Sequence, residues 1–244
     1  MRLHQVVAVV TGGTGVLGSR VVHRLLGEGA RVAVPSRTGP HPGEAASGSR
    51  LFSSRCDLRS ETEVERFFGE VGSLWGPVGI LVNAAGGYAG GSPVVDSPLP
   101  QWNGMILTNL TSCFLSCRAA LRMMIPRGEG CIVNVTARTA LEPRALRAAY
   151  AASKAGVIAL TRSIAEETRE TDICAVAVAP EALRTEANRS WMTPREFALA
   201  PDPGEAAELI LLLCMPQARG LSGSILNLTG RGYEPPGTSP EAVG

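Results

Sequence analysis

Tyr150 and Lys154 are the two residues whose types and spacing best suit acid–base chemistry, in the stretch Tyr-Ala-Ala-Ser-Lys. Residues four apart lie on one face of a helix. A lysine ammonium beside a phenol favours the phenolate, and we expect it to lower the tyrosine pKa from about 10 towards the working range. The pair therefore predicts a proton donor for a developing oxyanion. An ordinary surface lysine on a helix is the alternative explanation.

A glycine-rich stretch near the start of the chain, Thr11-Gly-Gly-Thr-Gly-Val-Leu-Gly18, follows the apolar run Val6–Val10 and opens a helical pattern. Its glycines permit a tight turn and a close approach of the backbone to a pyrophosphate, and the N-terminus of the following helix favours anions. The position between strand and helix predicts a dinucleotide site rather than a plain glycine turn. The expected contacts are Gly12, Thr14, Gly15, Val16, Leu17 and Gly18.

The residues after the second predicted strand indicate which dinucleotide binds. NAD enzymes usually carry an acid here that bonds the ribose 2′-hydroxyl. The stretch Val34–Thr38 has no carboxylate, whereas Ser36 and Arg37 suit a 2′-phosphate. NADP(H) is therefore favoured and NAD(H) is the alternative, in which Arg37 is a solvated loop residue.

Strand and helix patterns alternate along the whole chain. The strands are expected at Val6–Val10, Arg31–Val34, Leu51–Cys56, Gly79–Val82, Cys131–Val135, Ile173–Ala179 and Ser224–Leu228. Helices are expected at about 15–28, 60–71, 99–124, 150–168 and 203–214, with Asp57 and Ser60 as candidate N-caps of the second. This order predicts an α/β single-domain Rossmann fold over residues 1–232, a doubly wound seven-stranded parallel sheet with helices on both faces.

Three segments fall outside this alternation. The Gly/Pro/Ser-rich segment Thr38–Ser49 is expected to be a surface loop. Glu181–Pro203 shows no clear periodicity and is expected to be a long active-site loop. The proline-rich tail at 233–244 is expected to be disordered.

Composition excludes several classes of protein. The formal net charge of +1 without a basic run gives no indication of a nucleic-acid partner. No apolar stretch near the start is long enough to span a membrane, and no signal peptide is recognisable, so a cytoplasmic location is expected. The six cysteines lack metal-ligand spacing and the three histidines all lie within residues 4–41, so no metal is expected.

Further motifs stand in a familiar order: Asn83-Ala84-Ala85-Gly86 after the fourth strand, then Asn109, then Tyr150 and Lys154. Together with the glycine stretch, they resemble the short-chain dehydrogenase/reductase family to about residue 232. The resemblance implies that Lys154 also holds the nicotinamide ribose and that Asn109 anchors a water beside it. It implies adenine contacts at Asp57 and Leu58, and cofactor contacts at 83–86, Pro180 and Thr185. It further implies a small-molecule substrate and a homotetramer, or else a dimer, formed through the helices at 99–124 and 150–168.

The chain departs from the family at the position of the catalytic serine. Thirteen residues before Tyr150 stands Ala137, which cannot donate a hydrogen bond to the substrate oxygen. Thr136 is expected to face the other way because side chains alternate along a strand, and Thr139 is a candidate replacement. The family's glycine after Pro180 is replaced by Glu181.

Local stretches resemble the quinonoid dihydropteridine reductases within this family. These are the glycine stretch with Val16, residues 85–91 and residues 185–192. A conjugated C=O or C=N needs less oxygen polarisation than an isolated ketone, so the sequence predicts an NAD(P)H-dependent reductase of a small, cyclic substrate. Tyr88, Ala137, Thr139 and Trp191 are the expected substrate-side residues, although simple packing also explains Tyr88 and Trp191. Two alternatives stay open: a non-redox isomerase, dehydratase or cyclase using Tyr150 as acid or base, and a nucleotide-binding sensor.

Overall fold

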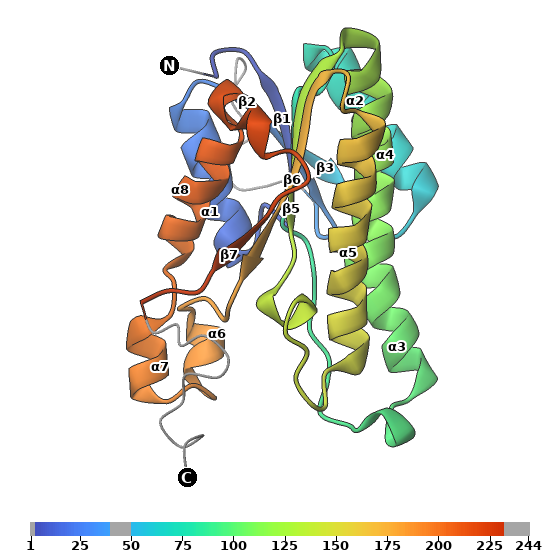
Figure 1. Ribbon diagram of the computed structural model, residues 1–244. Helices are drawn as coiled ribbons and strands as arrows, with labels where there is room; N and C mark the ends of the chain where they lie inside the picture. Colours follow the sequence, from blue (N-terminus) through green and yellow to red (C-terminus); the bar gives the residue numbers. More distant parts are fainter. Residues whose placement is uncertain (1–2, 40–49, 232–244) are drawn as a thin grey trace.

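The computed structural model describes residues 3–39 and 50–231, and Figure 1 shows one sheet with helices on both of its faces. All the strands run parallel in the order β3-β2-β1-β4-β5-β6-β7, which confirms the predicted Rossmann fold. The strands are β1 Val7–Thr11, β2 Arg31–Ser36, β3 Leu51–Arg55, β4 Ile80–Asn83, β5 Glu129–Val135, β6 Asp172–Pro180 and β7 Ile225–Leu228.

The α-helices divide between the two faces of the sheet (Figure 1). They are α1 Val16–Gly27, α2 Glu61–Trp75, α3 Leu99–Met105, α4 Ser112–Met124, α5 Ala148–Glu167, α6 Glu186–Arg189, α7 Pro194–Leu199 and α8 Pro203–Leu213. Helices α1 and α8 cover one face, and α2, α4 and α5 cover the other. This two-sided cover follows from strands that are apolar on both faces.

Each face of the sheet has its own core because successive side chains of a strand point to opposite sides. In β1, Ala8 and Val10 pack into the core beneath α1 and α8. Val7 and Val9 pack into the opposite core with Phe67 of α2. The apolar runs of the sequence are therefore buried on both sides, as expected.

Two expected segments differ in the structure. The helix expected at 99–124 is divided into α3 and α4 by a π-helical turn, Ile106–Thr111. The segment expected to be a loop, Glu181–Pro203, contains the short helices α6 and α7. Helix α7 begins with a capping box in which Thr193 accepts from the Glu196 N–H and the Glu196 carboxylate accepts from the Thr193 N–H.

Most of the loop expected at Thr38–Ser49 and the tail expected at 233–244 lie outside the described residues. Among the described residues, only the run Leu99–Arg127 is long and apolar enough to cross a membrane, and half of its most apolar window is buried inside the domain. A buried core helix meets the same criterion, so this run is weak evidence of a membrane span. All six cysteines are free and buried.

The chain changes direction across the sheet between β1 and β4. These strands are neighbours, but β2 and β3, which follow β1, extend to one edge of the sheet, and β5, β6 and β7, which follow β4, extend to the other. In open α/β sheets ligands bind at the carboxyl ends of the strands beside such a switch point. Thr11 and Asn83 end the two strands side by side, and the candidate site is built around them.

Candidate active site

The turn after β1 brings its glycines into contact with neighbouring backbone. Gly12 has φ +66°, and a Cβ atom there would lie 2.7 Å from the Ala85 nitrogen. The Gly15 N–H donates to the Gly12 carbonyl oxygen at 2.9 Å. A Cβ atom on Gly18 would collide with that same oxygen. The close packing explains why the turn needs glycine at these positions.

Helix α1 begins after this turn without a side-chain cap at Gly15. Its first N–H groups are therefore not satisfied by a capping side chain, and they favour an anion. Thr14 and Val16 are exposed beside them, Val16 with 55% of its surface accessible, while Leu17 packs against the core. The arrangement fits the pyrophosphate of a dinucleotide. The predicted contact residues all lie in this turn or at the start of α1.

A buried chain of polar side chains holds the turn in the sheet. The Thr11 hydroxyl donates to Asn83 Oδ1 at 3.2 Å and accepts from the Ala85 N–H at 3.2 Å. Asn83 Nδ2 donates to Asn134 Oδ1 at 2.9 Å, and Asn134 Nδ2 donates to Thr161 at 2.9 Å. Because the Asn83 amide is engaged in this chain, its side chain supports the turn instead of facing a ligand.

The residues expected at the ribose lie at the carboxyl end of β2. Ser36 is buried, and its hydroxyl is 3.3 Å from that of Thr38. Arg37 is exposed, and its charge contributes to the lowered pKa of the Asp57 carboxyl. The guanidinium of Arg37 therefore lies on the same side of the site as Asp57, where the sequence places the adenine end of the cofactor.

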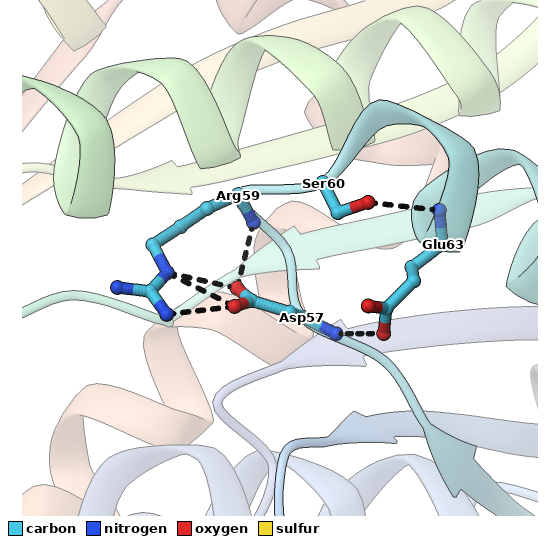
Figure 2. Close-up of polar contacts among 4 residues, drawn as sticks. All are labelled: Asp57, Arg59, Ser60 and Glu63. Atoms are coloured by element: carbon cyan, nitrogen blue, oxygen red, sulfur yellow. Dashed lines mark hydrogen bonds and ion pairs between the residues drawn. The ribbon is translucent and has the colours of Figure 1, made fainter.

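Asp57 is held by Arg59 (Figure 2). Its carboxylate accepts from the Arg59 N–H at 3.0 Å and from the guanidinium at 2.7–3.1 Å. These hydrogen bonds lower the pKa of the Asp57 carboxyl to about 2. Of the two candidate N-caps only Ser60 caps α2, accepting from the Glu63 N–H at 3.3 Å. The expectation for Asp57 as an N-cap was wrong because its carboxylate turns to Arg59. Leu58, between these two residues, packs against the core.

Asn109 and Lys154 converge on Gly86. A Cβ atom on Gly86 would lie 3.0 Å from Asn109 Oδ1 and 3.2 Å from Lys154 Nζ. Asn109, buried in the π-helical turn, accepts from the Gly87 N–H at 2.8 Å and donates to its carbonyl at 3.1 Å. It also donates to Ser153 of α5 at 3.0 Å. Asn109 thus ties the loop after β4 to the helix that carries Tyr150 and Lys154.

Lys154 is buried, and its ammonium donates to the Val135 carbonyl oxygen at 2.9 Å. Burial lowers its pKa to about 8. Burial also raises the pKa of Tyr150, and Arg147 is the charge that opposes this. The expectation that the lysine lowers the phenol pKa was therefore wrong for this structure, because the Lys154 side chain bends to the end of β5.

Ala137 lies in extended backbone directly after β5 and is buried. Thr136, next to it, donates its hydroxyl to the Lys154 carbonyl oxygen at 2.8 Å, so it is held against α5 as the alternation predicts. Thr139 lies in the 3-10 helix Arg138–Ala140 and is half-buried. Ala137 thus leaves this buried position without a side-chain hydrogen-bond donor. The Thr136 hydroxyl is already bonded to α5, so Thr139 is the next hydroxyl residue along the chain that could replace the donor.

Glu181, which replaces the family's glycine, pairs with two arginines. Its carboxylate lies 2.6 Å from Arg138 Nη1 and 3.2 Å from Arg144 Nη2. Arg138 also pairs with Glu142 at 2.7 Å. The network joins the segment after Ala137 to the segment after Pro180, which ends β6. Sequence reasoning missed it because the partners are 43 residues apart.

The remaining expected residues lie around the same end of the sheet. Thr185 is the N-cap residue of α6, without a side-chain cap bond. Trp191 is 57% exposed, and its indole N–H lies 3.3 Å from Asn188 Oδ1. Tyr88 contacts Tyr150 edge to face, with ring centroids 5.1 Å apart. The structure therefore brings Tyr88 against Tyr150, whereas Trp191 stands on an exposed surface.

Comparison with known proteins identifies the family that this fold and site define. A model of the short chain dehydrogenase family matches residues 6–196. The chain belongs to this family, whose members bind NAD(P)H, and it is an oxidoreductase enzyme.

The curated relatives cover nearly the whole chain. A putative ketoacyl reductase from Streptomyces coelicolor is 31% identical, over 92% of this chain and 95% of the relative. A 7alpha-hydroxysteroid dehydrogenase from Escherichia coli is 29% identical over 96% of both chains. Among solved structures, a crystal structure of an actinorhodin polyketide ketoreductase with NADPH is 30% identical. It covers 93% of this chain and 98% of its own, with a TM-score of 0.81.

Proposed function

We propose that the protein is an NADPH-dependent reductase that transfers hydride to a conjugated C=O or C=N of a small, cyclic substrate. The observation that carries the proposal is the buried Ala137, which has no side-chain donor at the position of the family's serine, in a chain that keeps Tyr150 and Lys154 on α5 and bonds Asn109 to Ser153 of that helix. A site with a proton donor but one fewer hydrogen-bond donor suits an acceptor whose electrophile is already activated by conjugation.

The chain's own residues bind the cofactor and donate the proton. The turn at Gly12–Gly18 binds the pyrophosphate, and Lys154 and Asn109, which converge on Gly86, hold the nicotinamide ribose end of the cofactor. A bound reduced nicotinamide supplies the hydride. Tyr150 donates its phenolic proton to the substrate oxygen or nitrogen. Its raised pKa keeps the phenol protonated at neutral pH, which is the form that a reductase needs.

NADPH is preferred in this proposal over NADH. Arg37 is exposed at the end of β2, with the buried Ser36 beside it and no carboxylate in the same stretch. A guanidinium binds a phosphate through charge-assisted hydrogen bonds, and it has no such partner in NADH. The structural relative that contains NADPH supports this preference.

A flat, conjugated ring is the proposed substrate shape. Tyr88 lies against Tyr150, and the exposed Trp191 stands on the segment that follows β6. The local resemblance to quinonoid dihydropteridine reductases supports a C=N acceptor. The named relatives, a ketoacyl reductase and a polyketide ketoreductase, support a C=O acceptor instead. Both acceptors place the atom that receives the proton next to Tyr150.

The test measures the oxidation of NADPH and of NADH with a panel of acceptors, and the loss of nicotinamide absorbance is the readout. The panel holds a quinonoid dihydropterin, cyclic imines, quinones, α-diketones and simple ketones. We expect turnover with the conjugated acceptors, NADPH preferred, and none with the Tyr150→Phe variant. Tight NADPH binding with no oxidation of any acceptor would refute the proposal. Product formation without NADPH loss would identify non-redox catalysis by Tyr150, which is the second hypothesis and is favoured by the missing serine at 137.

We further propose a homo-oligomer, a tetramer or else a dimer, in the cytoplasm. Large apolar side chains are exposed along α3 and α4: Leu99 is 67% exposed, Trp102 41% and Phe114 43%. Large apolar side chains exposed on neighbouring helices are typical of a protein contact. Light scattering of the purified protein and of Trp102→Glu tests the assembly, since a monomeric wild-type protein would refute it. The six free thiols support a reducing compartment.

A further inference from the structure

The loop after β4 and the segment before α5 are pressed together at the entrance to the site. The Gly91 N–H donates to the Leu146 carbonyl oxygen at 2.8 Å. A Cβ atom on Gly90 would lie 2.7 Å from that oxygen and 2.8 Å from the Tyr88 hydroxyl. Leu146 has φ +64°, a backbone conformation that costs free energy for a residue with a side chain. The fold holds this contact despite the strain.

The strained segment places Arg147 beside the two tyrosines. The Arg147 guanidinium carbon lies 5.8 Å from the centre of the Tyr88 ring, within cation–π distance. The Tyr88 ring in turn meets the Tyr150 ring at 75°, with centroids 5.1 Å apart. The cation, the aromatic ring and the proton donor therefore form one cluster.

The charge of Arg147 is not neutralised by an acid of the described residues. In the described ranges, 3–39 and 50–231, no carboxylate lies within ion-pair distance of Arg147, whereas Arg138 and Arg144 on the same segment are paired. Arg147 is also the N-cap residue of α5, which has no acid in its first turn. A cation is disfavoured at this end of a helix by the helix dipole, so helix stability does not explain its presence.

The remaining titratable groups around Tyr150 do not supply this charge. Lys154 is on the same helix, but its ammonium is directed to the Val135 carbonyl oxygen. Burial raises the pKa of Tyr150, the Tyr88 phenol adds to this, and Arg147 is the group that opposes both.

We propose that Arg147 is a positioning residue that stabilises the phenolate left on Tyr150 after proton transfer, and so offsets part of the loss of the serine at 137. The inference rests on the proposed role of Tyr150. In the reaction the hydride and its electron pair pass from the dihydronicotinamide to the acceptor carbon. The proton passes from Tyr150 Oη to the acceptor oxygen or nitrogen. The substrate is reduced, the cofactor is oxidised, and solvent returns a proton to Tyr150.

The experiment titrates Tyr150 directly and needs no substrate. The chain has three tyrosines, so protein labelled with carbon-13 at the tyrosine Cζ gives three signals, which Tyr88→Phe and Tyr150→Phe assign. The signals are followed against pH, with and without NADP⁺, in the wild type, Arg147→Gln, Arg147→Lys and Arg144→Gln. Arg144→Gln is the matched control because it removes a positive charge from the same segment but one that pairs with Glu181.

We expect Arg147→Gln to raise the pKa of Tyr150 by about one unit, a tenfold change in its acidity. Arg147→Lys should restore most of the wild-type value, and Arg144→Gln should shift it by less than about 0.3 unit. An unchanged Tyr150 pKa in folded Arg147→Gln would overturn the inference, and equal shifts in both glutamine variants would do the same. Neither outcome depends on whether the proposed substrate class is correct.

Turnover provides a second readout when an acceptor is available. In the oxidation direction the rate rises with pH as Tyr150 loses its proton, so Arg147→Gln should move this rise to higher pH, and Arg147→Lys should return it. A change in KM for the acceptor with an unmoved pH profile would overturn the inference and show that Arg147 binds substrate instead.

Discussion

Restoring a serine at position 137 is the perturbation that tests the proposed substrate class most directly. Ala137 is 6% exposed and its backbone is extended, with φ −155° and ψ 151°, so a serine fits there without backbone strain. An unpaired buried hydroxyl costs about 1–3 kcal/mol, which a domain with about 5–15 kcal/mol of stability tolerates. Ala137→Ser should therefore fold.

The expected gain depends on the acceptor. One oriented donor to a developing oxyanion contributes about 2.7–4 kcal/mol, or about 10²–10³ in kcat. An isolated ketone needs this donor, so Ala137→Ser should raise kcat/KM for simple ketones by up to about 10²-fold. A conjugated acceptor distributes the charge, so its kcat/KM should change by less than about tenfold. The ratio of ketone to conjugated-acceptor activity is the quantity to measure.

The assay compares NADPH oxidation by the wild type and Ala137→Ser with one simple ketone and one conjugated acceptor. Ala137→Gly is a control that changes the site without adding a donor. NADPH affinity, measured by fluorescence, checks that the cofactor site is intact. If folded Ala137→Ser binds NADPH normally and the ratio stays within about threefold of the wild type, the missing donor does not determine substrate choice.

Three further variants test the cofactor site. Arg37→Ala should weaken NADPH binding by about 1.5–3 kcal/mol and leave NADH binding nearly unchanged, as titration of both nucleotides would show; equal losses would refute the 2′-phosphate contact. Gly18→Ala should abolish dinucleotide binding and lower Tm, since its Cβ would collide with the Gly12 carbonyl oxygen, and unaltered calorimetry would contradict this. Arg59→Ala should lower the free energy of unfolding near neutral pH but not in strong acid. The depressed pKa of Asp57 contributes stability that is present above about pH 4 and is lost as pH falls through about 2, so the unfolding free energies of the two proteins should converge at low pH; a constant difference down to low pH would contradict this.

The sequence predicted the sheet well because a two-sided parallel sheet leaves a strong signal. Every apolar run became a strand, with ends shifted by a few residues. The π-helical turn at Ile106–Thr111 could not be predicted, since apolar spacing hardly distinguishes it from an α-helix. Helix α7 was predictable: the Thr193–Glu196 capping box and Pro194 at its first position are a local signal that the absence of periodicity concealed.

The sequence indicated which elements carry the candidate residues but not the electrostatics around them. Spacing along α5 correctly placed Tyr150 and Lys154 on one helix, beside the loop after β4. It could not show that the long lysine side chain bends to Val135, because spacing fixes Cβ atoms and not the end of a flexible chain. The role of Arg147 was equally inaccessible, since it depends on contact with a loop about 60 residues away in sequence.

The two departures from the family, at Ala137 and Glu181, form one feature of the structure. Arg138 directly follows Ala137, and its nearly buried guanidinium pairs with Glu181, which directly follows Pro180. With the glycine that the family usually has at 181, Arg138 would lose its ion pair with Glu181 and keep the one with Glu142. An enzyme that had merely lost its serine would have no reason to acquire a matching carboxylate on the neighbouring strand end. The ion pair therefore holds the two segments that carry these departures together, and we take this order to favour catalysis over the nucleotide-sensor alternative.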